Sequence, residues 1–462
     1  MKKTSGDSKR RRSSTKAKKN VRALFEPRSI TLIGSSKIVE DIGMTSPKLF
    51  ADVAYNLQTY FEGRVRVHDI EARGTLTRSD LTVIALPPKN SVTWARKAME
   101  NGTKAIIQLT GGFNREERKK YLELALKHHV RVLGPNTIMG VINTRIGLNT
   151  SFERDLMPPT GNISVISQSG GVGAMLLDWA NYYQIGLSKF VFTGDKADID
   201  DENILDYLAS DPKTRVIAMY IEGIKNGRKF VDLTRRITPR KPIIVLKGGI
   251  TTESAQRALS HTASVAGSDE IFNAAFKDAG IIRVEDIEDL FDASIALANQ
   301  PPMRGKNVCI VSNVGGPAIL AADEVARNQL HLAHLSDSTQ KKIKKLYPAI
   351  DIINPIDLIA DARAERYRNV LRLVLEDRNV DGVMVINMLK SCFFEPEDAK
   401  AIPEVASRYH KPVVDVPAGG DDFIKVTNVL KGTGIPSYNR PSKAALALKI
   451  LYEYGRINRK RS

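Results

Sequence analysis

The sequence predicts an α/β protein with doubly wound, mainly parallel sheets. From residue 21 onward, short apolar runs of strand length alternate with amphipathic stretches of helix length. Such strand–helix–strand alternation is typical of parallel sheets with helices on both faces. The length of 462 residues suits about three domains of roughly 150 residues each.

The first block of this alternation contains five expected strands and two expected helices. The apolar spacing places strands at 29–34, 64–67, 81–88, 105–110 and 130–136, and helices at 90–102 and 114–129. We therefore expect one sheet domain over residues 21–150.

Two further blocks restart the alternation after stretches rich in proline and glycine. Pro158 to Gly161 precede strands expected at 162–167, 190–192, 216–221 and 242–249, and Pro301 to Gly305 precede strands expected at 307–312, 382–389 and 412–417. The predicted division is a basic tail at 1–20 and domains at 21–150, 151–300 and 301–462.

The two later blocks also begin alike. At an offset of 145 residues, NISVISQSGGVGAMLLD (162–178) lies over NVCIVSNVGGPAILAAD (307–323), with one Asn, one Ser, two Gly and one Asp identical. Together with the shared proline–glycine entry, this match predicts a duplicated unit.

The net charge of +17 is high for a chain whose composition, 42% hydrophobic and 26% charged, is otherwise ordinary for a globular protein. The first twenty residues hold nine lysines and arginines and one aspartate, so they supply +8 of it. This tail has no apolar stretch, which excludes a secretory signal, and its composition predicts a disordered arm. A solvated arm is favoured over a nucleic-acid or phospholipid contact.

Cysteine content and hydropathy predict a soluble protein of a reducing compartment, and we expect it in the cytoplasm. Cys309 and Cys392 both lie in apolar segments, which argues against a disulfide framework and a structural zinc site. No apolar run approaches the roughly 20 residues of a membrane span. We expect no metal site on this chain.

Three places combine a strand end, glycine and a following stretch of helical pattern: 34–36 (GSS), 167–171 (SQSGG) and 312–316 (SNVGG). At such a turn the backbone N–H groups can approach an anion, and a helix dipole adds positive potential, so phosphate is the natural ligand. A tight turn without any ligand is the open alternative. The fingerprints GxGxxG and GxxxxGK[ST] are both missing, which argues against hydride transfer and P-loop chemistry.

His261 differs from the other histidines because it lies in a small, polar stretch, 258–270, after an expected strand. Ser268 is placed to cap the next helix, and Asp269 and Glu270 suit its first turn. A neutral imidazole there could act as a nucleophile that carries a phosphoryl group. An exposed loop histidine without a function is the alternative.

Several long stretches together resemble the ADP-forming acyl-CoA synthetases, relatives of succinyl-CoA synthetase. The stretch 259–292, which begins LSHTASVAGSDE, is similar to the phosphohistidine segment of that family. Further matches are GPN (134–136), VINTRIGLNTSF (141–152), SQSGGVG (167–173), GDKADID (194–200), YIEGIKNGRKF (220–230), SNVGGPAILAADE (312–324) and NPIDL (354–358). They extend from about residue 22 to near 454, and the resemblance is greatest to the alpha subunit of the acetate type.

The resemblance implies a Rossmann-like CoA-binding domain followed by two flavodoxin-like ligase domains, the first of which carries the phosphohistidine. The implied reaction converts acyl-CoA, ADP and phosphate into a carboxylate, CoA and ATP, with an acetate-type substrate. Phosphate would attack the thioester, the acyl phosphate would pass its phosphoryl group to His261, and the phosphohistidine would donate it to ADP.

The resemblance also implies roles for individual residues. Glu222 would orient the imidazole of His261, and two helix N-termini would cradle the phosphohistidine. The implied phosphate-binding residues are Ser167, Gln168, Ser169, Gly170, Gly171, Asn313, Gly315 and Gly316. The implied CoA-binding residues are Gly34, Ser35, Ser36, Pro88, Thr110, Gly111, Gly112 and Asn136.

No stretch resembles the ATP-grasp domain that would bind ADP or ATP with Mg²⁺. The resemblance therefore implies an ATP-grasp beta subunit as partner, in an alpha2beta2 heterotetramer. Acyl-CoA, carboxylate and phosphate would be the other ligands. We expect no membrane partner. A non-catalytic CoA-sensing or scaffolding protein on the same fold remains the alternative.

The sequence departs from the family pattern in two places. Residues 71–80, EARGTLTRSD, replace a longer segment with an Asn-Pro-Lys stretch, so a lysine that would touch CoA is absent there. Arg73 or Arg78 are the candidates to replace it. Asp195 stands where asparagine is common.

Overall fold

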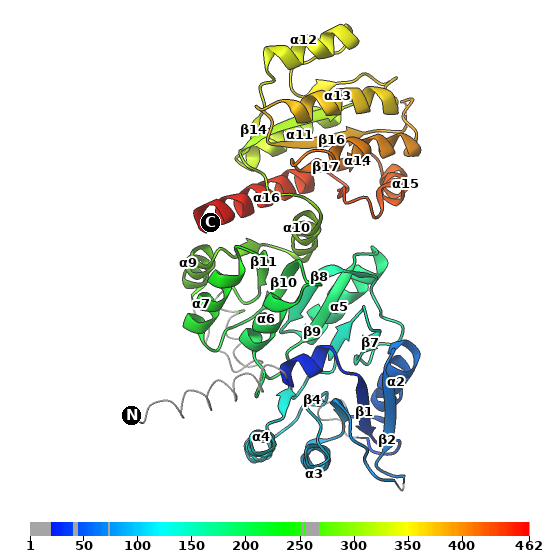
Figure 1. Cartoon of the computed structure of the whole chain (residues 1–462), viewed down its shortest axis with the longest axis vertical. Coiled ribbons are helices and arrows are strands. Elements are labelled where there is room, and N and C mark those ends of the chain that lie inside the picture. Colours follow the sequence, from blue (N-terminus) through cyan, green and yellow to red (C-terminus); the bar gives the residue numbers. More distant parts are fainter. Residues whose placement is uncertain are drawn as a thin grey trace, which may run out of the picture. The chain divides into compact units, whose positions relative to one another are not determined.

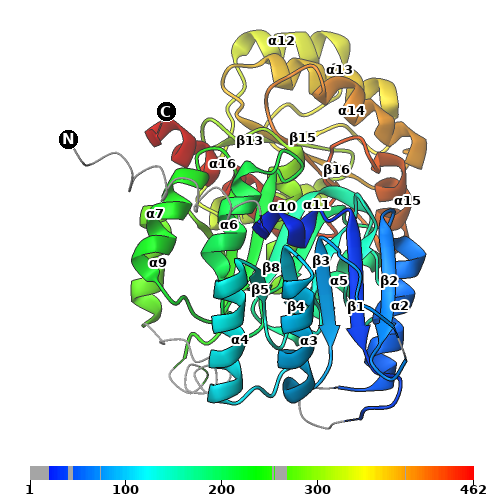
Figure 2. The ribbon, with the colours of Figure 1, turned by 60° about the horizontal axis from the view of Figure 1, so that its bottom comes forward.

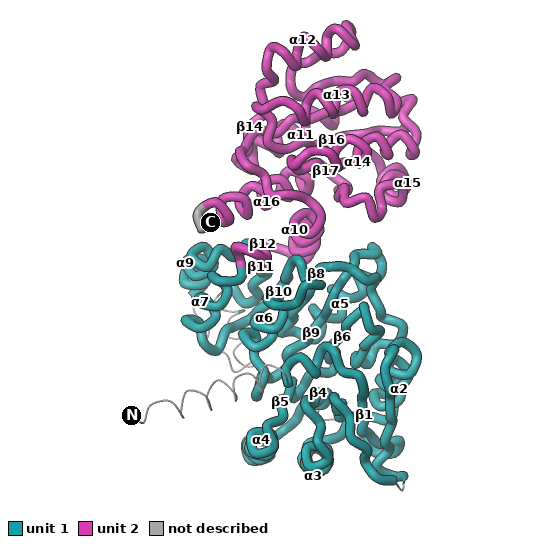
Figure 3. Tube along the Cα trace, in the orientation of Figure 1, with its two compact units in different colours: residues 1–237, 245–283 teal, residues 238–244, 284–462 magenta. Residues whose placement is uncertain are grey.

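The computed structural model describes residues 20–39, 45–72, 74–251, 254, 268–390 and 392–461 (Figure 1). Its internal contacts divide the chain into two compact units, which are described separately. Unit 1 comprises residues 1–237 and 245–283, and unit 2 comprises residues 238–244 and 284–462 (Figure 3). The strands form three sheets, whose mostly parallel pairing confirms the predicted α/β class. The division into three domains remains a prediction.

The first sheet has the strand order β2-β1-β3-β4-β5, and all its pairs are parallel. Its strands are β1 (Ser29–Gly34), β2 (Arg64–Asp69), β3 (Leu81–Ala85), β4 (Ala105–Gln108) and β5 (Arg131–Leu133). The helices are α2 (Pro47–Tyr60), α3 (Pro88–Glu100) and α4 (Arg115–His128). The chain leaves β1 and β3 in opposite directions, so right-handed crossovers place α2 on one face and α3 and α4 on the other. Figure 2 shows α3 and α4 side by side over this sheet.

The second sheet has seven strands in the order β12-β11-β10-β8-β9-β6-β7 and is mixed. Its strands are β6 (Val141–Asn143), β7 (Leu148–Asn149), β8 (Thr160–Ser167), β9 (Leu187–Phe192), β10 (Val216–Ile221), β11 (Ile243–Lys247) and β12 (Ile282–Val284). The helices are α5 (Gly170–Tyr182), α6 (Asp201–Ser210), α7 (Gly227–Ile237), α9 (Asp269–Ala279) and α10 (Ile287–Asn299). Strand β6 pairs antiparallel with β7 and β9, which the sequence did not predict.

The third sheet has the order β14-β13-β16-β17, with β15 also paired to β13, and it is parallel throughout. Its strands are β13 (Asn307–Ser312), β14 (His331–Leu332), β15 (Ile356–Asp357), β16 (Gly382–Asn387) and β17 (Val413–Pro417). The helices are α11 (Gly315–Arg327), α12 (Asp337–Leu346), α13 (Ala364–Glu376), the 3₁₀ helix η2 (Pro396–Lys400), α14 (Ala401–Ala406), α15 (Gly420–Leu430) and α16 (Pro441–Arg461).

Local signals explain where several helices begin. Ser46 accepts a hydrogen bond from the N–H of Leu49 before α2, and Asn114 and Glu117 form a capping box at α4. The central strands β3 and β16 are buried along their whole length, as expected for sheets covered on both faces. No helix within the described ranges is long and apolar enough to cross a membrane.

Candidate functional site

Each sheet reverses its strand order, and the three predicted glycine turns lie at these reversals. The reversals fall between β1 and β3, between β8 and β10, and between β13 and β16. In open α/β sheets, ligands bind beyond the carboxyl ends of the strands at such a reversal, because the connecting loops there diverge and leave a crevice. The turns at 34–36, 167–171 and 312–316 each follow the strand at a reversal.

In unit 1, the side chain of Gln168 joins the turn after β8 to the end of β10. Its Oε1 accepts hydrogen bonds from the N–H groups of Glu222 (2.8 Å) and Gly223 (3.1 Å). Its Nε2 donates to the carbonyl of Gly223 and to Oδ2 of Asp201, both at 2.9 Å. Gln168 is buried, so these four bonds fix the backbone of Glu222 beside the turn.

A buried ion pair stands behind Gln168. The ammonium group of Lys196 lies 3.0 Å from Oδ2 of Asp201, and both side chains are 2% exposed. Lys196 also donates to the carbonyl of Gly223 at 3.3 Å, and Lys225 donates to the carbonyl of Lys196. Burial and the neighbouring charge of Lys196 lower the pKa of Lys225. The pair therefore holds the amide of Gln168 in one orientation.

Glu222 follows β10, half-buried, with two polar groups close by. The hydroxyl of Tyr220 donates to Oε1 of Glu222 at 3.5 Å. Burial, and then the charge of Glu222, raise the pKa of Tyr220 to about 12, so it stays a donor at neutral pH. Burial lowers the pKa of Lys247 at the end of β11, whereas the charges of Asp269 and Glu222 act to raise it. This corner of unit 1 therefore combines a carboxylate with a buried ammonium group.

The turn after β13 in unit 2 repeats the hydrogen bonds of the turn after β8. Ser167 donates from Oγ to the carbonyl of Ser169 (2.7 Å), and Ser312 does the same to Val314 (2.8 Å). Asn313 takes the place of Gln168: its amide accepts from the N–H of Met388 (3.0 Å) and donates to the carbonyl of Met388 (2.9 Å). Both turns thus fix the first residue after the neighbouring strand.

The second glycine of each turn faces open space. A Cβ atom placed on Gly171 or on Gly316 would meet no atom within 4 Å. Neither residue has the positive φ that would itself demand glycine. Neither packing nor backbone conformation requires glycine at these two positions, and the absence of a side chain leaves room for an anion near the start of α5 and α11.

The turn at 34–36 differs, and the expectation of a helix directly after it was wrong. The first helix described after β1 begins only at Pro47, because Ser46 and Pro47 provide the start signals. Gly34 has a packing reason, since a Cβ there would lie 2.0 Å from Cδ2 of Phe50. The helix dipole at this reversal comes instead from α3, which begins at Pro88 directly after β3.

Side chains already occupy the N–H groups of this turn. Asp69 accepts from the N–H of Ser36 at 3.3 Å, and Oγ of Ser35 accepts from the N–H groups of Lys37 (3.1 Å) and Ile38 (3.0 Å). A CoA diphosphate at Ser35 and Ser36 would have to replace these acceptors. The assignment of this turn to CoA stays a prediction.

Among the remaining predicted CoA residues, Asn136 contacts the loop that follows β9. Asn136 donates from its backbone to the carbonyl of Thr110 (3.0 Å) and from Nδ2 to Oδ1 of Asp195 (3.3 Å). Thr110 is buried, with its hydroxyl bonded to the carbonyl of Leu86 and to Gln108. The exposed side is therefore formed by Gly112 and Asn136. Asp195, which stands where asparagine is common, therefore contacts Asn136, a predicted CoA-binding residue.

The other predicted residues are His261, the two arginines near the missing CoA lysine, and the residues at the start of α9. His261 and Arg73 lie outside the described residues. Arg78 precedes β3, at the end of the sheet opposite to Gly34 and Pro88, which argues against its replacing the missing CoA lysine. Ser268 is the N-cap residue of α9 as expected, but its side chain makes no capping hydrogen bond, and Asp269 and Glu270 do occupy the first turn.

Comparison with known proteins identifies the family. The model of the succinyl-CoA ligase like flavodoxin domain matches residues 160–297. The alpha subunit of the ADP-forming acetate–CoA ligase II of Pyrococcus furiosus is 33% identical over 452 residues, which cover 93% of this chain and 96% of that subunit. The chain belongs to the ADP-forming acetate–CoA ligase alpha subunits. It is therefore a ligase, as the resemblance implied.

Two further relatives agree with this family. The ADP-forming acetate–CoA ligase of Methanocaldococcus jannaschii is 35% identical over 441 residues, which cover 93% of this chain and 62% of that longer protein. The solved structure of acetyl-coenzyme A synthetase 1 of Ca. Korarchaeum cryptofilum, titled dinucleotide forming and in complex with phosphate and ADP, has a TM-score of 0.84 and 30% identity, covering 95% of this chain and 97% of that one. The acetate–CoA ligase fold thus extends over nearly the whole chain.

Sequence reasoning missed the residues that support the site of this ligase subunit. Lys196 lies within the matched stretch GDKADID, but its ion pair with Asp201, which in turn accepts from Gln168, depends on the tertiary fold. Tyr220 and Lys247 read as ordinary strand residues. The sequence did contain one indication for Lys247, because a lysine at the end of a buried strand and directly before Gly-Gly is unusual and points to a functional site.

Proposed function

We propose that this chain is the CoA-binding and phosphohistidine subunit of an ADP-forming acyl-CoA synthetase with an acetate-type substrate. Inorganic phosphate attacks the thioester carbonyl of acyl-CoA, which releases CoA as the thiolate and forms an acyl phosphate. A ring nitrogen of His261 then attacks that phosphorus and releases the carboxylate. Finally, ADP takes the phosphoryl group from the histidine and becomes ATP.

The observation that carries this proposal is the arrangement of the turn after β8 beside Glu222. Gln168 lies in the turn and its side chain bonds to the backbone of Glu222 and Gly223, so the backbone that carries Glu222 is held beside the turn, where a Cβ atom on Gly171 would meet open space. The turn suits the oxygens of a phosphoryl group, because backbone N–H groups and the dipole of α5 favour a dianion. Glu222 suits the imidazole, because a carboxylate on one ring nitrogen makes the other nitrogen a better nucleophile.

The segment that carries His261 begins and ends near this corner. Thr251 closely follows Lys247, and Asp269, whose charge acts on Lys247, follows Ser268. His261 is seven residues from Ser268, and seven residues span at most about 25 Å. The charges of Asp269 and Glu222 both act on Lys247, so a described residue that flanks the segment shares the corner that holds Glu222, which supports the proposed pairing of Glu222 with His261.

The first sheet is the proposed CoA site. The start of α3 at Pro88 suits the diphosphate of CoA, because a helix N-terminus favours an anion. The exposed residues Gly112 and Asn136 suit the thiol end of CoA. Lys89, exposed in the first turn of α3, provides positive charge at the edge where the expected CoA lysine is missing.

We further propose that a beta subunit with an ATP-grasp domain binds ADP or ATP with Mg²⁺. The support is that relatives of matching length are named alpha subunits, and that a longer relative contains the matched region as 62% of its length. The solved relative in complex with phosphate and ADP supports the same ligands for the assembled enzyme. The proposed assembly is alpha2beta2, in the cytoplasm.

The test is turnover of the full chain co-expressed with a candidate ATP-grasp beta subunit. We expect ADP formation from ATP that requires CoA, a carboxylic acid and both subunits, with acetate among the accepted acids. Glu222→Gln should lower kcat at least about a hundredfold, within the range of general acid–base effects. The matched control is Glu100→Gln, an exposed residue at the end of α3, which should leave kcat unchanged.

Two results would contradict this proposal. One is binding of acetyl-CoA without any ADP formation in the presence of a functional beta subunit, which is the behaviour of a CoA sensor. The other is full activity of the Glu222→Gln enzyme.

A further inference from the structure

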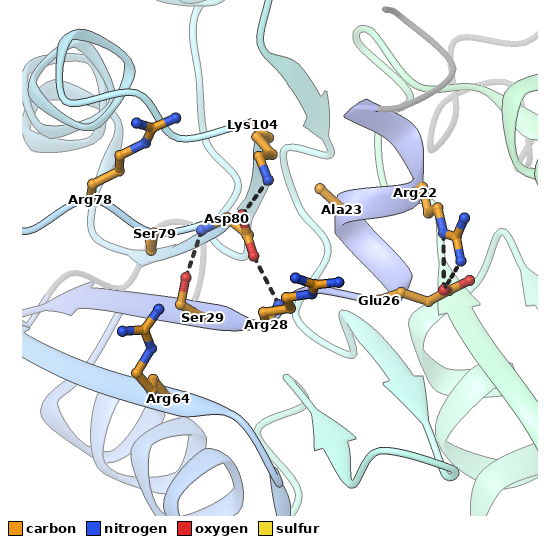
Figure 4. Close-up of a pocket in the computed structure, with 10 residues that line it drawn as sticks. All are labelled: Arg22, Ala23, Glu26, Arg28, Ser29, Arg64, Arg78, Ser79, Asp80 and Lys104. Atoms are coloured by element: carbon orange, nitrogen blue, oxygen red, sulfur yellow. Dashed lines mark hydrogen bonds and ion pairs between the residues drawn. The ribbon is translucent and has the colours of Figure 1, made fainter.

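A basic cavity of about 670 Å³ lies at the amino ends of the strands of the first sheet (Figure 4). Ser29 begins β1, Arg64 begins β2, and Ser79 and Asp80 directly precede β3. This edge is opposite to the carboxyl ends where Gly34, Pro88 and Gly112 lie. The cavity is therefore separate from the proposed CoA site.

The floor of the cavity is rigid because Asp80 joins three neighbouring strand starts. Its carboxylate accepts from the N–H of Arg28 (3.0 Å) and from the ammonium group of Lys104 (2.5 Å). Its own N–H donates to the hydroxyl of Ser29 at 3.0 Å. Burial acts to raise the pKa of Asp80, but the hydrogen bonds from Lys104 and Arg28 outweigh it and lower the pKa. The carboxylate is therefore charged at neutral pH and fixed in place.

The described side chains that line the cavity carry an excess of positive charge. Five cationic side chains line it against two carboxylates. Arg22 binds Glu26 through two nitrogens (3.0 and 2.7 Å), and Lys104 pairs with Asp80, so these two cations are neutralised. The other three guanidinium groups make no ion pair with any carboxylate in the described part of the chain; they belong to Arg28, Arg64 and Arg78.

The lining indicates the class of ligand. Guanidinium groups bind phosphate oxygens through paired N–H donors, and three of them around one cavity suit an anion with several charges. Ala23 is the only apolar residue that lines the cavity in the described structure, and no aromatic ring is present on which a base could stack. The volume leaves room for a short phosphate chain with bound water.

We propose that this cavity binds a small polyphosphate anion, of the class of inorganic pyrophosphate and tripolyphosphate, through Arg28, Arg64 and Arg78. The argument uses only the cavity and its charges, so it stands whether or not the proposed ligase mechanism is correct. The same chemistry is available from a free polyphosphate and from the phosphate tail of a nucleotide.

The test is isothermal titration calorimetry of the full chain with inorganic pyrophosphate at low ionic strength. We expect the double variant Arg64→Ala/Arg78→Ala to bind at least tenfold more weakly than the wild type. Arg66→Ala is the matched control, because Arg66 is an exposed arginine on the same strand but does not line the cavity. Its affinity should stay within twofold of the wild type.

The single substitution Arg64→Glu, which reverses the charge, gives an independent test. It remains usable if the double variant does not fold. It should weaken binding at least as much as the double variant, and circular dichroism should confirm that it is folded.

Titrations with tripolyphosphate and with Mg²⁺-free ATP distinguish the two sources of the phosphate chain. Binding of ATP as tight as tripolyphosphate assigns the site to a nucleotide tail, and weaker ATP binding assigns it to free polyphosphate.

Two results would overturn the proposal. Unchanged pyrophosphate affinity in both the double variant and Arg64→Glu would show that the anion binds elsewhere, for example at the glycine turns. An equal loss in Arg66→Ala would show that the general positive field of unit 1 is responsible, and not a site.

Discussion

The side chain of Gln168 should stabilise the predicted phosphate turn more than any other side chain in it. The change to test is Gln168→Ala, which removes four hydrogen bonds from a buried position. Three of these bonds join neutral groups and are each typically worth about 1 kcal/mol, and the fourth, to the carboxylate of Asp201, is worth about 2 kcal/mol. Gln168→Ala should therefore lower the free energy of unfolding by about 5 kcal/mol when no water replaces the lost amide.

Asn313→Ala is the matched comparison in unit 2. Asn313 makes two equivalent hydrogen bonds, both to neutral backbone groups of Met388, so about 2 kcal/mol is expected. If water enters the space left by Gln168 and restores part of the hydrogen bonding, the loss in unit 1 approaches the value for unit 2.

The assay is hydrogen–deuterium exchange at the amides that these side chains hold. In Gln168→Ala, the amides of Glu222 and Gly223 lose their acceptor, and protection should fall by at least tenfold and up to roughly a thousandfold. The amide of Met388 should keep its protection in this variant and lose it in Asn313→Ala. Unchanged protection at Glu222 and Gly223, or an equal fall at Met388 in Gln168→Ala, would refute the reasoning.

Three further predictions follow from single positions. Gly171→Ala adds a methyl group in open space, so the unfolding temperature should stay within about 2 °C while phosphoryl transfer falls at least tenfold; Gly34→Ala, whose methyl would meet Phe50, should lower the unfolding temperature instead. Lys443→Met removes the ammonium group that lies within 4 Å of four carboxylates. It should lower the free energy of unfolding, measured with urea, by about 3 to 5 kcal/mol. Arg440→Ala, which breaks an exposed ion pair, should lower it by less than about 1 kcal/mol. Burial raises the pKa of Asp415 to about 8, so its contribution to stability is fully present below about pH 4 and is lost as the pH rises through about 8. Calorimetry should show that the stability of the wild type falls from pH 5 to 8 more than the stability of Asp415→Asn. Equal pH profiles of the two proteins would contradict this.

The longer strands of the sheets were predictable because they carry their own local signal. The apolar runs at 29–34, 216–221 and 307–312 coincide with β1, β10 and β13, since buried parallel strands are apolar along their whole length. The hairpin of β6 and β7 was not predictable, because strands of three and two residues are too short to show a period.

The candidate site was predictable only in part, for the same reason. The sequence indicated both Gly-Gly turns, but it could not separate Gly34, which is needed for packing against Phe50, from Gly171, which faces open space. The bonds from Gln168 to Asp201 and Glu222 join residues 33 and 54 positions apart, so they exist only after the sheet has formed.

The proposed phosphohistidine is tested most directly by phosphate labelling of this chain. The full chain, incubated with an ATP-grasp beta subunit and ATP carrying a radioactive γ-phosphate, should acquire an acid-labile, base-stable phosphate that maps to His261 and is lost on addition of ADP. The His261→Ala variant should acquire none. Equal labelling of that variant, or a wild-type chain that stays unlabelled beside an active beta subunit, would contradict the account.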